Sequence, residues 1–179
     1  AQALPLHKID LREAGHPLPD ENSLRGTQEI LDLLSRTRGD DLVICLISGG
    51  GSALLELPVE GVLLDDLRAT TDALLRSGAT INEMNALRKH LSRVKGGQLA
   101  RRSQAPILSL ILSDVLESPL ETVGSGPTAP DSTTFAGACR KAPTRDLLGA
   151  RASGRRLART QPVAAHPHSP GRNRSTHGA

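Results

Sequence analysis

Two short apolar runs stand out in the hydrophobic pattern, at residues 42–47 and 107–112. Both consist mainly of aliphatic residues with almost no polar alternation, which is typical of strands buried on both faces in a parallel sheet. Alternating apolar positions within residues 1–12 suggest a further, short edge strand. Helical periodicity fills much of the chain between these runs, and the connections are long enough for parallel crossovers. The pattern predicts an α/β fold with a parallel sheet and flanking helices.

Three helices are predicted from their capping residues. Asp20 is placed to cap a helix over residues 21–36, whose apolar face holds Leu24, Leu31 and Leu34. A second helix, over residues 64–77, should end at Gly78.

The second helix presents Leu67, Leu74 and Leu75 on one face. The third helix begins at a capping box, in which Thr80 precedes Glu83 by three residues, and is expected to run to Lys95, before Gly96 and Gly97. A short helical stretch is expected around Phe135.

Two glycine-rich loops follow the strands. The first runs from Ser48 through Gly49, Gly50 and Gly51 to Ser52, and the second covers residues 124–128. Glycine can adopt positive φ and turn its N–H groups toward one point, so each loop could hold an anion, although a plain strand-to-helix turn is an equal alternative for the first loop. Neither the Walker lysine nor the dinucleotide fingerprint is present, because no lysine follows the glycines and Leu54 occupies the last fingerprint position.

Several polar side chains are placed near these loops. Asp114 follows the second strand, where ligands of open α/β sheets collect, so a metal or hydroxyl partner is preferred over a capping role. Arg88 and Lys95 share a basic helix face, which is by default a solvated face, while a lysine before two glycines also suits a phosphate. His16 lies in a loop with two prolines, where bonding to backbone is the favoured interpretation from the residues alone.

Composition narrows the class of protein. The chain has 179 residues, a single Phe and no Trp or Tyr, so any core is aliphatic. The two cysteines form no disulfide framework, which favours a reducing cytoplasm, and no apolar run is long enough for a membrane span. Residues 1–140 carry 14 Lys and Arg against 18 Asp and Glu, whereas residues 141–179 carry 8 against 1.

The motifs, taken together and in order, resemble the class II glycerate kinases, or glycerate 2-kinases, which are also often labelled hydroxypyruvate reductases. The matching segments span about residues 10–136. They are Glu13-Ala-Gly-His-Pro-Leu-Pro-Asp20, Ser48-Gly-Gly-Gly-Ser-Ala-Leu54, Ser77-Gly-Ala-Thr-Ile81, Asn85 with Arg88-Lys-His-Leu-Ser92, Lys95-Gly-Gly97, Ser113-Asp-Val115 and Ser125-Gly-Pro-Thr128.

The resemblance implies a two-domain enzyme with a Rossmann-like N-terminal domain, which uses ATP and Mg²⁺ to phosphorylate the 2-hydroxyl of D-glycerate. Phosphoryl transfer depends on positioning and charge neutralisation. Lys95, Arg88 and Asp114 would then be catalytic, with Asp114 holding the metal. Substrate and phosphate binding would involve His16, Ser48, Gly49, Gly50, Gly51, Ser52, Asn85, Gly96, Gly97, Ser125, Gly126 and Thr128.

Three departures from the family pattern are expected to matter. Glu117 and Ser118 replace a Gly-Asp pair, which could weaken metal binding. Relatives have a further upstream segment and a second domain, so residues 1–139 correspond to a partial N-terminal domain that would be inactive alone. Residues 140–179 form an irregular basic tail, best explained by a frameshift, because a frame displaced by one base over residues 148–155 can give a sequence similar to the family's continuation.

Two rival functions remain open at this stage. One is an NAD(P)H-dependent hydroxypyruvate reductase, against which the lack of a dinucleotide fingerprint argues. The other is a non-enzymatic protein that binds nucleic acid through its basic tail. If the tail is a frameshift product, nucleic acid is not a partner.

Overall fold

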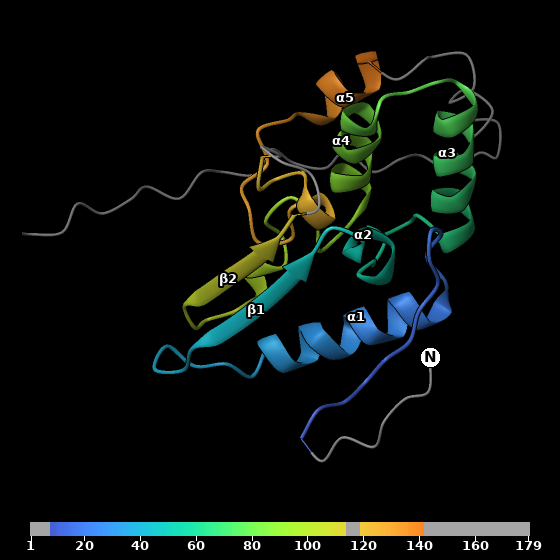
Figure 1. Cartoon of the computed structure of the whole chain (residues 1–179). Helices are drawn as coiled ribbons and strands as arrows, with labels where there is room; N and C mark the ends of the chain where they lie inside the picture. The colour runs from blue at the N-terminus through green and yellow to red at the C-terminus, as the bar shows by residue number, and fades with distance from the viewer. Residues whose placement is uncertain (1–7, 114–118, 142–179) are drawn as a thin grey trace, which may run out of the picture.

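The computed structural model describes residues 8–113 and 119–141, with side chains placed as far as Ala138. Its sheet contains two strands, β1 (Val43–Ser48) and β2 (Ile107–Leu112). They are parallel and in register from Val43 opposite Ile107 to Ser48 opposite Leu112, so both end at the same edge. The predicted strands and their parallel pairing are confirmed, and the fold is α/β (Figure 1).

One face of this sheet is exposed, so the prediction of strands buried on both faces is wrong for the described chain. Ile44 and Leu46 are 58% and 75% exposed, and Leu108, Leu110 and Leu112 lie on the same outer face. The inner face packs on a cluster that includes Val43 and Cys45 of β1. The labelled helices lie to one side of the sheet in Figure 1, which leaves the outer aliphatic side chains uncovered.

The predicted helices are present. They are α1 (Glu21–Leu34), α3 (Leu64–Arg76) and α4 (Ile81–Leu91), with the short helices α2 (Gly51–Leu54) and α5 (Phe135–Lys141) and the 3₁₀ turns η1 (Ala100–Arg102) and η2 (Val123–Ser125). Asp20 caps α1 through a 2.9 Å bond that its carboxylate accepts from the Ser23 N–H. Thr80 and Glu83 form the expected capping box, and Gly78 follows α3 with a φ of +72°.

Helix α4 ends four residues before the predicted end at Lys95. Ser92 is extended and forms an antiparallel bridge with Pro58, so the chain leaves the helix to pair with a distant segment. Because Pro58 is distant in sequence, no residue pattern within the helix predicts this pairing or the helix end that goes with it.

Other local predictions need correction. Leu75 on α3 is 57% exposed, whereas Leu67 and Leu74 are buried. The suggested edge strand falls partly on residues 1–7, which lie outside the described chain, and residues 8–12 form no strand. Leu24 is half-buried rather than part of the core.

Two aliphatic clusters hold the described chain together. One joins α1 to the segment after α4 through Leu31, Leu34, Val94 and Leu99. The other packs α3 against α4, with Leu74, Met84 and Leu87 among its members, and includes Ala138 of α5. The first cluster thus fixes α1 against β1 and the segment after α4, and the second fixes α3, α4 and α5 against one another. Among the described residues, no helix is long and apolar enough to cross a bilayer.

Candidate functional site

A cavity of about 520 Å³ lies where both strands end. Gly49 and Gly50 follow β1, Ser113 follows β2, and all three line it. This is the edge of an open α/β sheet at which ligands bind, and the volume suits a small molecule. The lining contains seven of the predicted site residues: His16, Gly49, Gly50, Ser52, Asn85, Arg88 and Ser125.

The first glycine loop reaches the cavity without left-handed backbone. Gly50 has a φ of −74° and precedes α2, and none of the residues 49–51 has positive φ. The positive φ that glycine permits is therefore not used in this loop. A Cβ added at Gly51 would meet no atom within 4 Å, and one at Gly50 only the His16 Nε2 at 4.0 Å. These glycines leave space for a ligand beside the backbone rather than enabling a strained turn.

The second glycine loop has the opposite character. Gly124, Ser125 and Gly126 have φ values of 59°, 63° and 59°, so three residues in succession are left-handed. Ser125 is the sole non-glycine residue with positive φ in the described chain. Such a conformation persists when its surroundings hold it, and it is characteristic of functional sites.

Hydrogen bonds fix Ser125 between the first loop and α4. Its hydroxyl lies 2.8 Å from the Ser52 hydroxyl and donates to the Asn85 Oδ1 at 3.3 Å. Since that donation uses the one Ser125 hydroxyl proton, Ser52 is the donor in the other bond. These three hydrogen-bonded side chains form a polar part of the cavity lining.

Arg88 supplies positive charge to the same cavity. Asn85 and Arg88 are three residues apart on α4 and thus share a face. The guanidinium is half-buried and makes no hydrogen bond or ion pair with another side chain of the described segments. Burial lowers the pKa of Arg88 and the charge of Glu56 opposes this shift, but the guanidinium stays charged at neutral pH. A half-buried cation that forms no direct ion pair favours binding of a carboxylate or phosphate.

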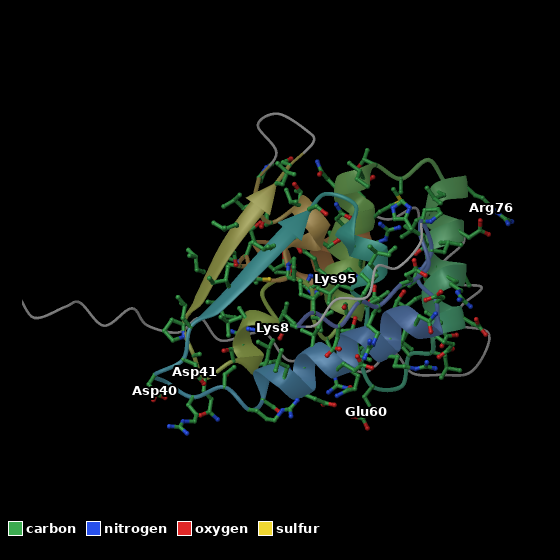
Figure 2. The ribbon with its side chains drawn as sticks, turned by 60° about the horizontal axis from the view of Figure 1, so that its bottom comes forward. Lys8, Asp40, Asp41, Glu60, Arg76 and Lys95 are labelled. Atoms are coloured by element: carbon green, nitrogen blue, oxygen red, sulfur yellow. The ribbon has the colours of Figure 1, made fainter. Side chains whose placement is uncertain are left out.

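Lys95 lies behind the cavity and does not line it. Its side chain is 1% exposed, its Nζ forms an ion pair with the Glu56 carboxylate and donates to the Leu55 carbonyl at 3.0 Å. Burial lowers the pKa of Lys95, and the Glu56 charge acts in the opposite direction. Figure 2 shows Lys95 in the interior, while Asp40, Glu60 and Arg76 point outward.

Gly96 and Gly97 are likewise turned away from the cavity. Their N–H groups donate to the carbonyls of Ser125 and Gly126 at 3.1 and 2.7 Å, so neither is available to a ligand. Both have positive φ. In this structure the Lys95-Gly96-Gly97 turn supports the second glycine loop.

The other predicted residues are scattered. Ser48, Gly51, Gly126 and Thr128 do not line the cavity, and the Thr128 hydroxyl accepts a 2.8 Å bond from Ser109 on β2. Asp114, Glu117 and Ser118 lie outside the described residues.

Sequence reasoning missed several residues of the site. Asn82 and Thr122 also line the cavity, and Glu56 pairs with Lys95. Asn82 precedes Asn85 by three residues on α4, so its helical spacing was a usable signal. Glu56 carries no local signal, since its partner is distant in sequence.

The described residues do not by themselves form a metal site. No group of three or more His, Cys, Asp or Glu side chains capable of holding a metal ion occurs within residues 8–113 and 119–138. The predicted Mg²⁺ ligand, Asp114, is not among them. The glycine loops, hydroxyls and guanidinium that are present fit the anionic groups of a substrate or nucleotide.

Residues 1–153 match the family described as a domain of unknown function, DUF4147. The chain is 55% identical over 135 residues to a glycerate 2-kinase from Pyrococcus horikoshii and 50% identical over 131 residues to a D-glycerate 2-kinase from Thermotoga maritima. These alignments cover 75% and 73% of this chain. The chain belongs to the glycerate 2-kinase family.

This family membership confirms the resemblance drawn from the motifs. The chain spans about a third of the length of these curated relatives, 31% in both cases. A solved glycerate kinase structure from Thermotoga maritima superposes with a TM-score of 0.74 at 45% identity, over 83% of this chain and 35% of that one. A relative from Agrobacterium vitis, 49% identical over 76% of this chain and 31% of its own length, is named provisionally as a hydroxypyruvate reductase.

The family match runs to residue 153, past the division predicted at residue 139. That division, and the interpretation of residues 140–179 as a frameshifted tail, stay predictions.

Proposed function

We propose that the cavity binds D-glycerate and the terminal phosphates of ATP, and that the described chain forms one wall of a cleft for phosphoryl transfer to the glycerate 2-hydroxyl. The observation that carries this proposal is Arg88, a half-buried cation that forms no ion pair with a described side chain and lines the cavity together with both glycine-rich loops. The names of the relatives support the choice of substrate.

The parts have complementary roles in this proposal. Arg88 neutralises a carboxylate or phosphate, and the backbone around Gly49 and Gly50 lets that group approach closely. The Ser52 and Asn85 side chains orient polar atoms of the substrate. ATP supplies the phosphoryl group, and Mg²⁺, held through Asp114 and the phosphates, would neutralise their charge.

Binding to the full chain tests the proposal directly. Titration of D-glycerate and of ATP, followed by calorimetry, should give saturable binding that weakens by about 10- to 100-fold in Arg88→Ala, as expected for loss of a buried charged hydrogen-bond donor. Arg93→Ala is the matched control, because Arg93 is exposed and does not line the cavity. Absence of binding in the unmodified chain, or equal losses in the two variants, would refute the proposal.

The provisional name of the Agrobacterium relative keeps a reductase as the second candidate. An assay with D-glycerate and ATP that follows ADP release, run beside one with hydroxypyruvate that follows NADH oxidation, discriminates the two. We expect ADP release to be the activity of proteins with this cleft. NADH oxidation without ADP release would favour the reductase instead.

A further inference from the structure

The turn that carries Lys95 connects both walls of the cavity from behind. On one side, the Lys95 Nζ reaches Glu56, which follows α2 and thus the first glycine loop. On the other side, the next two residues donate their N–H groups to the carbonyls of Ser125 and Gly126 in the second loop.

Glu56 is held as firmly as Lys95. Its side chain is 6% exposed, its Oε1 accepts the Leu57 N–H at 3.0 Å, and its backbone N–H donates to the Thr27 hydroxyl at 2.9 Å. The Oε1 atom thus bonds to the backbone of the segment that carries Glu56, while Oε2 forms the ion pair with Lys95. The two segments are also joined by the bridge between Pro58 and Ser92 and by the Arg93 N–H, which donates to the Leu57 carbonyl at 2.8 Å.

We infer that Glu56 and Lys95 are positioning residues, whose ion pair sets the distance between the segments that carry Ser52 and Ser125 to the cavity. The Ser52–Ser125 hydrogen bond joins the loops on the cavity side, and the ion pair joins the same two segments behind it. Ser125 occupies a left-handed conformation that a serine does not favour, so its place depends on such support.

The ion pair also affects the net charge next to the cavity. Glu56 lies close enough to Arg88 for its charge to raise the pKa of the guanidinium against the effect of burial. With Lys95 the three groups carry a net charge of +1, which one bound anion neutralises. The inference about loop geometry does not depend on the proposed function, whereas its consequence for ligand binding rests on that function.

Amide hydrogen exchange of the full chain, measured by NMR without ligand, tests the geometry. In Lys95→Met, exchange at the Gly96 and Gly97 amides should accelerate at least about 10-fold relative to amides of α3, and the Ser52 and Ser125 backbone signals should shift. If the ion pair only stabilised the fold, its loss would accelerate amide exchange throughout the chain instead.

Lys95→Met alone leaves the buried Glu56 charge unpaired, which can unfold the chain. A second variant avoids this problem. Glu56→Gln combined with Lys95→Met removes both charges and should restore global protection while the exchange at Gly96 and Gly97 stays fast. Arg76→Met is the control, since it breaks an exposed ion pair with Asp72 on α3, and it should change none of these signals. Unchanged relative exchange and unchanged Ser52 and Ser125 signals in a folded pair variant would overturn the inference.

Titration with D-glycerate then separates this inference from the proposed function. If the unmodified chain binds D-glycerate, the double variant should bind it at least about 10-fold more weakly with Arg88 intact. Equal affinity would overturn the positioning role at the ligand. If the unmodified chain does not bind, the proposed function fails, and the exchange data still decide whether the pair positions the loops.

Discussion

The two glycine-rich loops at the strand ends look alike in sequence but use glycine for different reasons. In the first, Gly50 has an ordinary helical backbone, and the space beside the glycines is open. In the second, Gly124 and Gly126 are left-handed, and a Cβ at Gly126 would lie 2.7 Å from the Glu121 carbonyl oxygen. The first loop needs small residues to admit a ligand, whereas the second needs them to fold at all.

The largest effect should come from Gly126→Ala. Left-handed strain and the backbone clash with Glu121 together should lower the free energy of unfolding by about 3–4 kcal/mol, as measured by urea denaturation. Gly124→Ala is the matched control. Gly124 has the same φ, but its added Cβ would meet the Ile47 side chain at 3.3 Å, so a loss of about 1–2 kcal/mol is expected. Equal losses would show that φ alone matters in this loop.

The next effect concerns Ser125, which combines strain with two hydrogen bonds. Ser125→Ala keeps the strain and removes the bonds, so it should destabilise the chain by about 1–2 kcal/mol in the same measurement. Ser125→Gly removes both the bonds and the strain, and its stability should be about 1 kcal/mol higher than that of the alanine variant. If the alanine variant were the more stable of the two, the left-handed backbone would not be strained.

Gly50→Ala should act in the opposite direction to Gly126→Ala. Because alanine tolerates this backbone, the free energy of unfolding should rise by up to about 1 kcal/mol through the unfolded state. The added methyl group lines the cavity and should weaken D-glycerate binding by about 10-fold or more, measured by calorimetry. A fall in stability comparable to that of Gly124→Ala would remove the distinction between the loops.

The smallest effect is a pH dependence in the contact between α4 and the segment that follows the second loop. His90 on α4 lies 3.2 Å from the Thr133 hydroxyl, and burial lowers its pKa although the Asp131 charge opposes this. In the window from the ordinary pKa of 6.5 down to the lowered one, the unfolded chain takes up a proton that the folded chain does not. Stability contributed by neutral His90 is therefore complete above the ordinary pKa and is lost as pH falls through this window.

Urea denaturation at pH 7.5 and 5.5 measures this loss, with His90→Gln as the variant that cannot titrate. The decrease on acidification should be smaller in the variant than in the unmodified chain. Identical decreases would exclude His90 as the source of the pH dependence.

Local signals in the sequence determined much of the fold. Asp20, Thr80 with Glu83, and Gly78 mark helix boundaries through contacts within a few residues, and these contacts form wherever the chain later packs. The apolar runs at 42–47 and 107–112 with long crossovers determined the parallel pair, and the ordered set of motifs determined the family. The cavity residues near strand ends, such as Gly49 and Ser125, followed from that topology.

Only the tertiary structure decided what depends on distant partners. Lys95 has the sequence context of a phosphate-binding lysine, yet it is buried against Glu56, 39 residues away. Helix α4 ends at Leu91 because Ser92 pairs with Pro58. The glycine triplet is not left-handed, since its last member, Gly51, is already the first residue of α2. Burial, pairing and backbone strain are properties of segments brought together by folding, so no periodicity or motif within one segment contains them.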